Sequence, residues 1–231
     1  MTFESISVVG DGQVGHTLAA RLAGRGTAVR SVGRDLAVGD ADLVLLAVPD
    51  RAIAEVAQAL EPGPWVAHLS GATTLTALAP HTRRFSIHPL QTFTLERGPD
   101  QLDGAWAAVS GESGEALEAG FGFAQLLGVH AFELADEDRP LYPAAAMFVA
   151  AFLVTIHDAA AELFRAVGAP PEALEPLLRR TIENGFAPTG PHTRADWTTI
   201  EGHLAAIRER RPELEPLYRS LAAATEDLAV R

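Results

Sequence analysis

Residues 8–26 read VVGDGQVGHTLAARLAGRG, and this stretch decides the fold. Gly10, Gly12 and Gly15 have the spacing G-x-G-x-x-G and follow directly on the apolar run ISVV. The apolar residues after them recur at helical spacing: Val14, Leu18 and Leu22. A second strand-like run begins at about Thr27. A strand, a glycine turn, a helix and a second strand in this order predict a dinucleotide-binding βαβ unit.

Each part of this unit has a physical task in holding a dinucleotide. Gly10 would make the tight turn, Gly12 would let a pyrophosphate approach the backbone, and Gly15 would let the helix pack closely on the strand. The amides at the helix N-terminus, where Gln13 and Val14 lie, would donate to the phosphates. The alternative is a tight turn in an α/β protein that binds no nucleotide.

The first part of the chain repeats the alternation of strands and helices. Seven apolar or β-branched runs occur: SISVVG, TAVRSVG, ADLVLLAVP, WVAHLS, RFSIHP, AWAAVS and VHAFELA. They predict an α/β fold with a Rossmann-like, doubly wound parallel sheet at residues 1–134. Helical patterns alone follow and predict an all-α domain at 135–231. Because only residues 34–40 separate the second and third runs, we expect no crossover helix there.

The end of the second strand bears on which nucleotide binds. An NAD site usually has Asp or Glu here for the ribose hydroxyls, whereas this chain has Ser31, Gly33 and then Arg34. A guanidinium at Arg34 suits a 2′-phosphate, so we expect NADP as the cofactor. Asp35 keeps NAD open, and Arg34 as an ordinary solvated loop residue is the further alternative.

Other strand ends supply candidate lining residues. Val48 and Pro49 end the third strand and Ser70 ends the fourth. Open α/β sheets bind ligands outside the carboxyl ends of their strands, so these residues would line the adenosine and nicotinamide crevice. Plain strand-ending turns are the alternative. His68, inside its strand, is expected to be a core histidine whose ring nitrogens have hydrogen-bond partners.

The segment SIHPLQTF, residues 86–93, offers a candidate proton-transfer residue. Pro89 biases His88 toward an extended backbone, which lets the ring project from the same edge as Ser70. All eighteen basic residues are arginines, so imidazole is one of the few groups able to pass a proton near neutral pH. Alternatively, His88 orders its loop through a backbone hydrogen bond.

A second polar segment lies between predicted helices and reads NGFAPTGPHTRADW, residues 184–197. Arg194 could clamp a carboxylate or phosphate of a small, anionic substrate, with Asp196 orienting the guanidinium. The alternative is a helix connection with a capping residue and a structural Arg-Asp pair.

Composition excludes several classes of function. A net charge of -12 without basic clusters disfavours nucleic-acid and anionic-membrane partners. The chain has no cysteine and no lysine, which removes thiolate and Schiff-base chemistry, and its eight histidines are scattered, so we expect no metal site. No secretory signal pattern is recognisable at the N-terminus, and we expect a cytoplasmic protein.

The first helical stretch of the second domain predicts self-association. It is apolar nearly all round from Pro143 to Ile156 and is too short in that core to span a bilayer. Such a helix must be buried on more than one side. We therefore expect a homodimer formed through the C-terminal helices.

Together, the Gly10 motif, SIHPLQTF, the YPAAA helix start at Tyr142 and TGPHTRADW resemble the Rossmann-like family with a C-terminal DUF2520 domain. Relatives of that family include 6-phosphogluconate dehydrogenase, pyrroline-carboxylate reductase and coenzyme F420-dependent NADP oxidoreductase. The resemblance implies an NADP-binding domain, a helical dimerisation domain and oxidoreductase activity. It would place histidine, asparagine and glycine where this chain has Pro143, Ala151 and Ala195.

The leading hypothesis is an NADP-dependent oxidoreductase that transfers hydride between the nicotinamide and a small C=O or C=N substrate. His88 would assist proton transfer and Arg194 would anchor the substrate. A dimeric dinucleotide-binding protein that has lost catalysis is the alternative, because Pro143 and Ala151 replace polar residues. An F420-linked NADP oxidoreductase is a weaker one.

Overall fold

The computed structural model describes residues 2–33 and 35–229. The chain divides into two compact units, Met1–Phe148 and Val149–Arg231. The first contains all the strands of the described residues, and the second contains helices only. The domain boundary that we expect after residue 134 stays a prediction.

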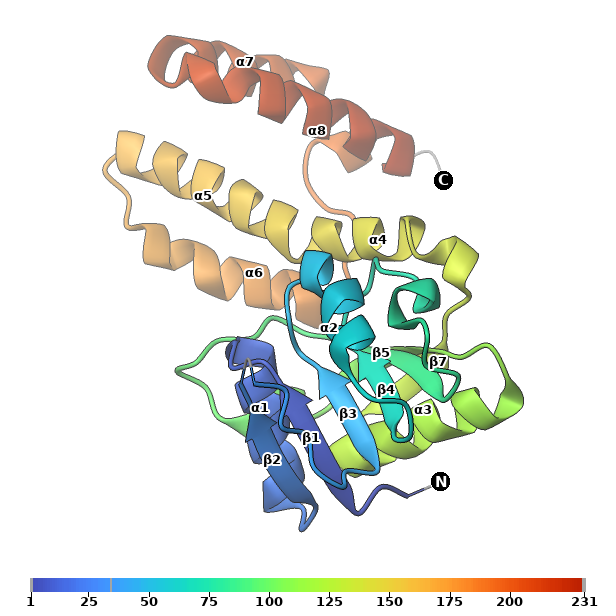
Figure 1. Ribbon diagram of the computed structural model, residues 1–231. Helices are drawn as coiled ribbons and strands as arrows, with labels where there is room; N and C mark the ends of the chain where they lie inside the picture. Colours follow the sequence, from blue (N-terminus) through green and yellow to red (C-terminus); the bar gives the residue numbers. More distant parts are fainter. Residues whose placement is uncertain (1, 34, 230–231) are drawn as a thin grey trace. The chain divides into compact units, whose positions relative to one another are not determined.

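A seven-stranded sheet forms the centre of the first unit (Figure 1), and each of the seven predicted runs coincides with one strand, the fifth of which continues one residue past its run. The strands are β1 (Ser5–Val9), β2 (Ala28–Val32), β3 (Leu43–Leu46), β4 (Trp65–His68), β5 (Arg84–Leu90), β6 (Trp106–Ser110) and β7 (His130–Glu133). Their order is β2-β1-β3-β4-β5-β6-β7. The predicted α/β fold class is confirmed.

The sheet is mixed, because β6 and β7 run opposite to the first five strands. β5 pairs with β6 in antiparallel fashion, whereas every other neighbouring pair is parallel. Residues 91–105, all of them described, contain one 3-10 turn, η3 (Pro99–Leu102), and no crossover helix. A connection without a crossover helix favours the antiparallel return.

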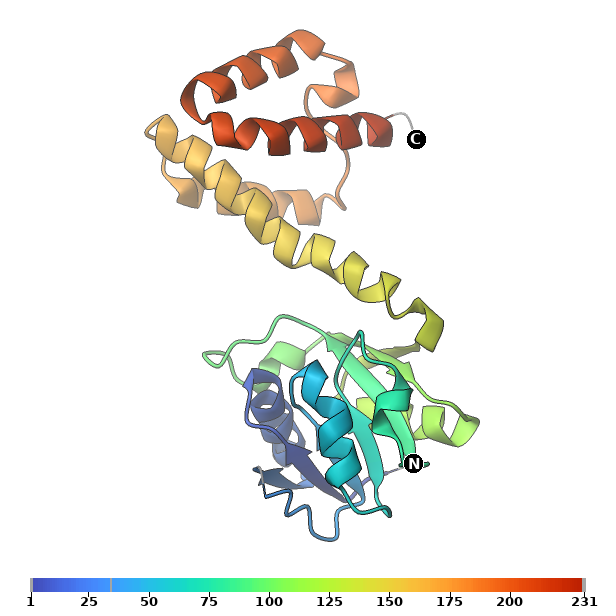
Figure 2. The same ribbon diagram turned by 45° about the horizontal axis from the view of Figure 1, so that its top comes forward.

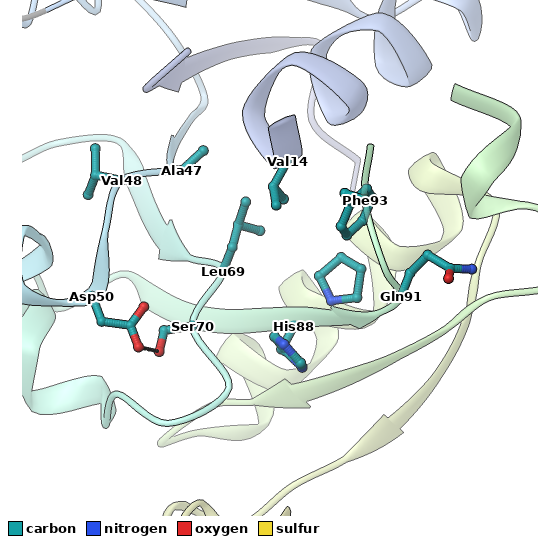
Figure 3. A pocket seen from close by; sticks show the side chains of 10 residues that line it. Val14, Ala47, Val48, Asp50, Leu69, Ser70, His88, Gln91 and Phe93 are labelled. Atoms are coloured by element: carbon teal, nitrogen blue, oxygen red, sulfur yellow. Dashed lines mark hydrogen bonds between the residues drawn. The ribbon is translucent and has the colours of Figure 1, made fainter. Parts of the chain in front are cut away.

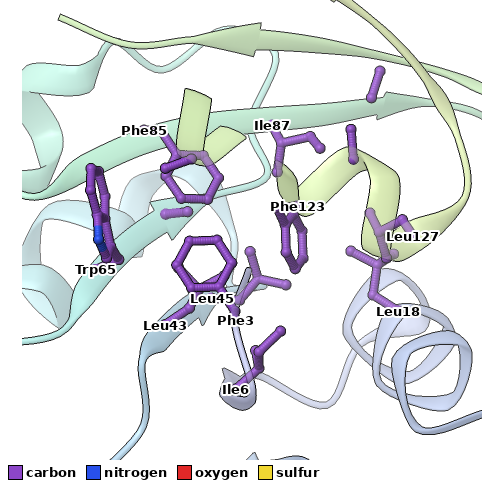
Figure 4. Close-up of a cluster of buried hydrophobic side chains, with 14 of the residues drawn as sticks. Phe3, Ile6, Leu18, Leu43, Leu45, Trp65, Phe85, Ile87, Phe123 and Leu127 are labelled. Carbon is purple, nitrogen blue, oxygen red and sulfur yellow. The ribbon is translucent and has the colours of Figure 1, made fainter. Parts of the chain in front are cut away.

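Helices cover both faces of the sheet. α1 (Gln13–Gly24) and α3 (Gly114–Leu127) pack on one face, and α2 (Ile53–Ala59) with the 3-10 turn η2 (Leu75–Leu78) packs on the other. On the first face four aromatic rings meet with centroids 6.1 to 6.4 Å apart (Figure 4): Phe3, Trp65, Phe85 and Phe123. Offset and edge-on aromatic packing fixes the strands that carry the site.

The expected absence of a helix after β2 is confirmed for the described residues between β2 and β3. Leu36 and Val38 pack on the same apolar cluster as α2 and cover the face where a helix would lie. The Ser7 hydroxyl donates to the Val38 carbonyl at 2.8 Å and ties this link to β1. A short loop thus covers this part of the sheet in place of a helix.

Helices dominate the rest of the chain. α4 (Leu141–Val149) closes the first unit, and the second contains α5 (Ala151–Ala166), α6 (Leu174–Glu183), α7 (Trp197–Arg210) and α8 (Glu215–Ala229). α7 and α8 pack against each other (Figure 2). Leu141–Ala166 is long and apolar enough to cross a membrane by length and composition alone. The apolar segment expected from the sequence, residues 143–156, is shorter than this span.

Candidate active site at the carboxyl ends of the strands

The glycine turn between β1 and α1 has the geometry that its spacing predicts. Gly10 has φ +113°, and a Cβ there would lie 2.4 Å from the Ala47 carbonyl oxygen at the end of β3. A Cβ at Gly15 would lie 2.5 Å from the Gly10 carbonyl oxygen. Both positions therefore need glycine for packing. Gly12 differs, since a Cβ there would meet nothing within 4 Å.

Gly12 is the N-cap of α1, and no side chain caps this helix, which is described throughout. The first backbone amides of a helix have no partner within the helix, so a capless N-terminus leaves donors for an anion. Gln13 and Val14 begin this turn. Open space at Gly12 lets a bulky phosphate group approach these amides, which is the arrangement that a pyrophosphate needs.

A cleft of about 840 Å³ lies beside the turn. The residues around it come from the ends of β1, β2 and β3 and from α2, and they include Gly10, Gly12, Ser31, Gly33, Val48 and Pro49. Four of the predicted cofactor residues thus line one cleft. Arg34, the residue on which the NADP prediction depends, lies outside the described residues.

A smaller hollow of about 210 Å³ shares Ala47 and Val48 with this cleft (Figure 3). It is lined by Val14, Ala47, Val48, Asp50, Leu69, Ser70, His88, Pro89, Gln91 and Phe93. We call it the His88 pocket. The structure therefore brings the predicted residues Val14, Val48, Ser70 and His88 together, beside the cleft that holds the glycine turn.

Ser70 organises the loop after β4. Its hydroxyl donates to Asp50 Oδ2 at 2.7 Å and accepts from the Thr73 amide at 2.9 Å. Asp50 lines the His88 pocket next to the Ser70 hydroxyl (Figure 3). Ser70 thus orders the loop on one side of the pocket and holds the Asp50 carboxylate beside it.

His88 lies in β5, which continues past it to Leu90. Its Nδ1 and the Tyr142 hydroxyl share a hydrogen bond of 2.8 Å, and the two rings meet edge to face. A Cβ on Gly71 would lie 3.2 Å from the imidazole, so Gly71 leaves room for the ring. Burial, together with the positive charge of Arg139, lowers the pKa of His88. The imidazole is therefore neutral at neutral pH.

Arg139 is a site residue that the sequence interpretation missed. Its side chain is 2% exposed, pairs with Asp136 and donates to the Ser86 hydroxyl. A further N–H donates to the Ser70 carbonyl at 3.2 Å. The guanidinium thus joins the loop after β4 to β5. Nothing in the run ADEDRP distinguishes Arg139 from a solvated charge, because its burial depends on contacts with strands far away in sequence.

Arg194 and Asp196 both belong to the second unit. Arg194 is exposed at the end of the 3-10 turn η6 (His192–Arg194). Asp196 is the N-cap of α7 and accepts hydrogen bonds from the Thr199 amide at 3.2 Å and from its hydroxyl at 2.7 Å. Among the described ion pairs none joins Arg194 to Asp196. Their catalytic roles stay predictions.

Two sequence families match this chain. Residues 105–225 match the family described as domain of unknown function (DUF2520), and residues 29–92 match the Rossmann-like domain. Among curated protein sequences, none matches the chain.

Solved structures share the fold along the whole length. A Bacteroides fragilis protein provisionally described as an NADP oxidoreductase is 21% identical, with a TM-score of 0.80 over 96% of this chain and 98% of its own. Pyrroline-5-carboxylate reductase of Streptococcus pyogenes is 18% identical, with a TM-score of 0.63 over 99% and 98%. A reductive aminase of Aspergillus terreus, solved with NADPH, is 17% identical, with a TM-score of 0.65 over 98% and 96%.

Proposed function

This chain belongs to the DUF2520 family, and from that premise we propose that it is an oxidoreductase that uses a nicotinamide dinucleotide. More finely, we propose NADP as the cofactor and a small C=O or C=N compound as the substrate. One observation carries the proposal: the open, capless helix N-terminus at Gly12 faces a cleft that adjoins the His88 pocket. A cofactor whose phosphates bind at α1 can reach both hollows from there.

The neighbouring folds support the same reading. The description of the Bacteroides fragilis protein names NADP, and the Aspergillus terreus enzyme was solved with NADPH. The Streptococcus pyogenes enzyme is a reductase of pyrroline-5-carboxylate. For this chain we therefore propose to test nicotinamide cofactors together with C=O and C=N substrates.

The residues of the chain would bind and orient the reactants. A bound, reduced nicotinamide supplies a hydride to an electrophilic carbon. Gly10, Gly12 and the first turn of α1 would hold the phosphates. His88 would assist proton transfer at the reacting atom, and Arg194 would anchor an anionic group of the substrate.

Calorimetric titration of NADPH and NADH tests the cofactor assignment. We expect NADPH to bind the wild-type protein and Arg34→Ala to remove its preference over NADH. Gly12→Ala should weaken binding by about tenfold, or about 1.4 kcal/mol, because its methyl group occupies the space of the pyrophosphate. Gly24→Ala is the matched control, since a Cβ at this end of α1 also meets nothing within 4 Å. If neither nucleotide binds the wild-type protein, the proposal fails.

A binding protein without catalysis is the second candidate, favoured by the alkyl side chains of Pro143 and Ala151. The two candidates differ in turnover. NADPH oxidation with a panel of carbonyl and imine compounds, lost in His88→Ala, would contradict the candidate that only binds. NADPH binding without turnover of any compound would support it.

A further inference from the structure

The His88 ring is held in one orientation by groups from three parts of the chain. Tyr142 at the start of α4 bonds its Nδ1, and Gly71 after β4 lies against its face. Arg139, after β7, donates hydrogen bonds to the Ser70 carbonyl and to the Ser86 hydroxyl, two residues before His88. Nε2 of His88 has no hydrogen-bond partner among the described residues, and the imidazole lines the pocket.

The direction of the Tyr142 hydrogen bond determines where the imidazole carries its hydrogen. Burial raises the pKa of Tyr142 to about 12, so the phenol stays protonated. Its hydroxyl has His88 Nδ1 as its partner among the described hydrogen bonds. A phenol that donates to Nδ1 leaves Nε2 as the protonated nitrogen of a neutral ring.

The charges around His88 favour this neutral ring. Arg139 is the buried cation, and its electrostatic effect opposes a second positive charge on the imidazole. Asp50, which lines the pocket, acts in the opposite direction and is the smallest of the three causes. The other titratable groups near this wall are Asp136, which pairs with Arg139, and His68, which is itself buried.

We propose that Tyr142 is a positioning residue that fixes His88 as a neutral Nε2–H donor facing the pocket, and that the pocket therefore takes a carbonyl substrate. This inference rests on the proposed function. A carbonyl oxygen accepts an Nε2–H hydrogen bond, whereas an iminium nitrogen presents its own N–H and meets the donor unfavourably.

The reaction balances with solvent water as the proton source. In this reduction a C–H bond of the reduced nicotinamide would break and a C–H bond would form at the carbonyl carbon, while the C=O π pair would move to oxygen. The carbon is reduced and the nicotinamide is oxidised. His88 Nε2–H stabilises the charge that develops on oxygen, and a water proton completes the hydroxyl group. His88 itself returns unchanged.

The protein offers a matched control for Tyr142. Tyr218 bonds Nδ1 of His203 at 2.8 Å in the second unit, and its ring is likewise edge to face with the imidazole. Tyr142→Phe and Tyr218→Phe therefore each remove one hydroxyl from a histidine. Only the first change should alter the His88 pocket.

Nitrogen-15 NMR of histidine-labelled protein near neutral pH reads the tautomer directly. We expect the Nε2–H form at His88 in the wild type and in Tyr218→Phe, and a mixture of tautomers in Tyr142→Phe. A His88 that is Nδ1–H or cationic in the wild type overturns the inference. So does a tautomer that Tyr142→Phe leaves unchanged.

Steady-state assays with NADPH test the substrate class separately. We expect aldehydes or ketones to be reduced in preference to cyclic iminium compounds, and Tyr142→Phe to lower kcat about tenfold or more while the KM for NADPH stays constant. Preferential iminium reduction overturns the inference but keeps the proposed function. If NADPH does not bind, the proposed function fails and the NMR result alone decides the role of Tyr142.

Discussion

His68 is a buried histidine in the last position of β4, and it titrates far from its ordinary range. The side chain is 0% exposed, and its Nδ1 accepts a hydrogen bond of 3.2 Å from the Ser70 backbone amide. Burial, followed by the positive charge of Arg139, lowers the pKa of His68 to about 4. The sequence predicted a satisfied core histidine here. The burial is confirmed, whereas Nε2 has no hydrogen-bond partner among the described residues.

The lowered pKa of His68 predicts that the protein loses stability in mild acid. In the unfolded chain this histidine titrates near pH 6.5, so between about pH 6.5 and pH 4 the unfolded state binds more protons. Stability is therefore fully present above pH 6.5 and falls as the pH drops toward 4, by up to about 3 kcal/mol from this group. Urea unfolding at several pH values measures the slope.

Two variants separate this effect from the rest of the protein. His68→Asn keeps an acceptor for the Ser70 amide without the titration, and it should flatten the slope between about pH 6.5 and pH 4. His157→Asn changes an exposed histidine and should leave the slope as in the wild type. Equal slopes in His68→Asn and the wild type would contradict the assignment.

At the scale of single residues, the sequence predicted part of the candidate site. Val48, Ser70 and His88 could be placed at one sheet edge because each ends or nearly ends a strand. Arg139 and Tyr142 could not, because only the path of the chain after β7 carries them back to β4 and β5. Strand periodicity contains no information about that path.

At the scale of elements, the turn that leads into α7 contains a residue with a strained backbone. Ala195, between η6 and the Asp196 cap, has φ +50° and ψ +37°, in the left-handed region. An L-residue with a Cβ pays about 1 to 2 kcal/mol there. Glycine, the residue that the family resemblance implies at this position, would adopt the conformation freely.

We predict that Ala195→Gly stabilises the protein by about 0.5 to 1 kcal/mol, because relief of the strain exceeds the added entropy of the unfolded chain. Ala206→Gly, at an exposed position inside α7, should instead destabilise it by about 1 kcal/mol. Urea unfolding of both variants checks the opposite signs. A destabilised Ala195→Gly protein would show that this turn is not under strain.

Element positions were more predictable than strand directions. All seven strand runs and the missing helix after β2 follow from local periodicity and connection length. The reversal of β6 does not, since an alternating strand has the same pattern in either direction. It depends on how residues 91–105 return along the sheet, which is a property of tertiary packing.

At the scale of the whole molecule, the main feature without an explanation inside one chain is its apolar helical surface. An 18-residue window within Leu141–Ala166 has a mean hydropathy of 1.7, and 6% of that window is buried. Leu141, Val149 and Val154 are 73%, 70% and 69% exposed. Contiguous exposed apolar surface of this kind marks an interaction site.

A second copy of the chain fits this surface better than a bilayer does. The uncharged run at residues 141–156 spans about 24 Å at 1.5 Å per residue, which is less than the roughly 30 Å of a hydrocarbon core. Asp158, Glu162 and Arg165 follow within the same helix. Apolar helix faces commonly pair across a two-fold axis, which uses the same patch twice. We therefore propose a homodimer through α4 and α5.

Sedimentation equilibrium tests this dimer. We expect the wild type to have about twice the mass of the 24.4 kDa chain, and Val154→Glu to weaken association at least about a hundredfold, because it buries a charge in an apolar interface. Val167→Glu is the control, since Val167 is similarly exposed at 65% but lies beyond the apolar run. A monomeric wild type, or one recovered only with detergent or vesicles, would contradict the dimer. In the second case a membrane would cover the surface, and Val154→Glu would release the protein into solution.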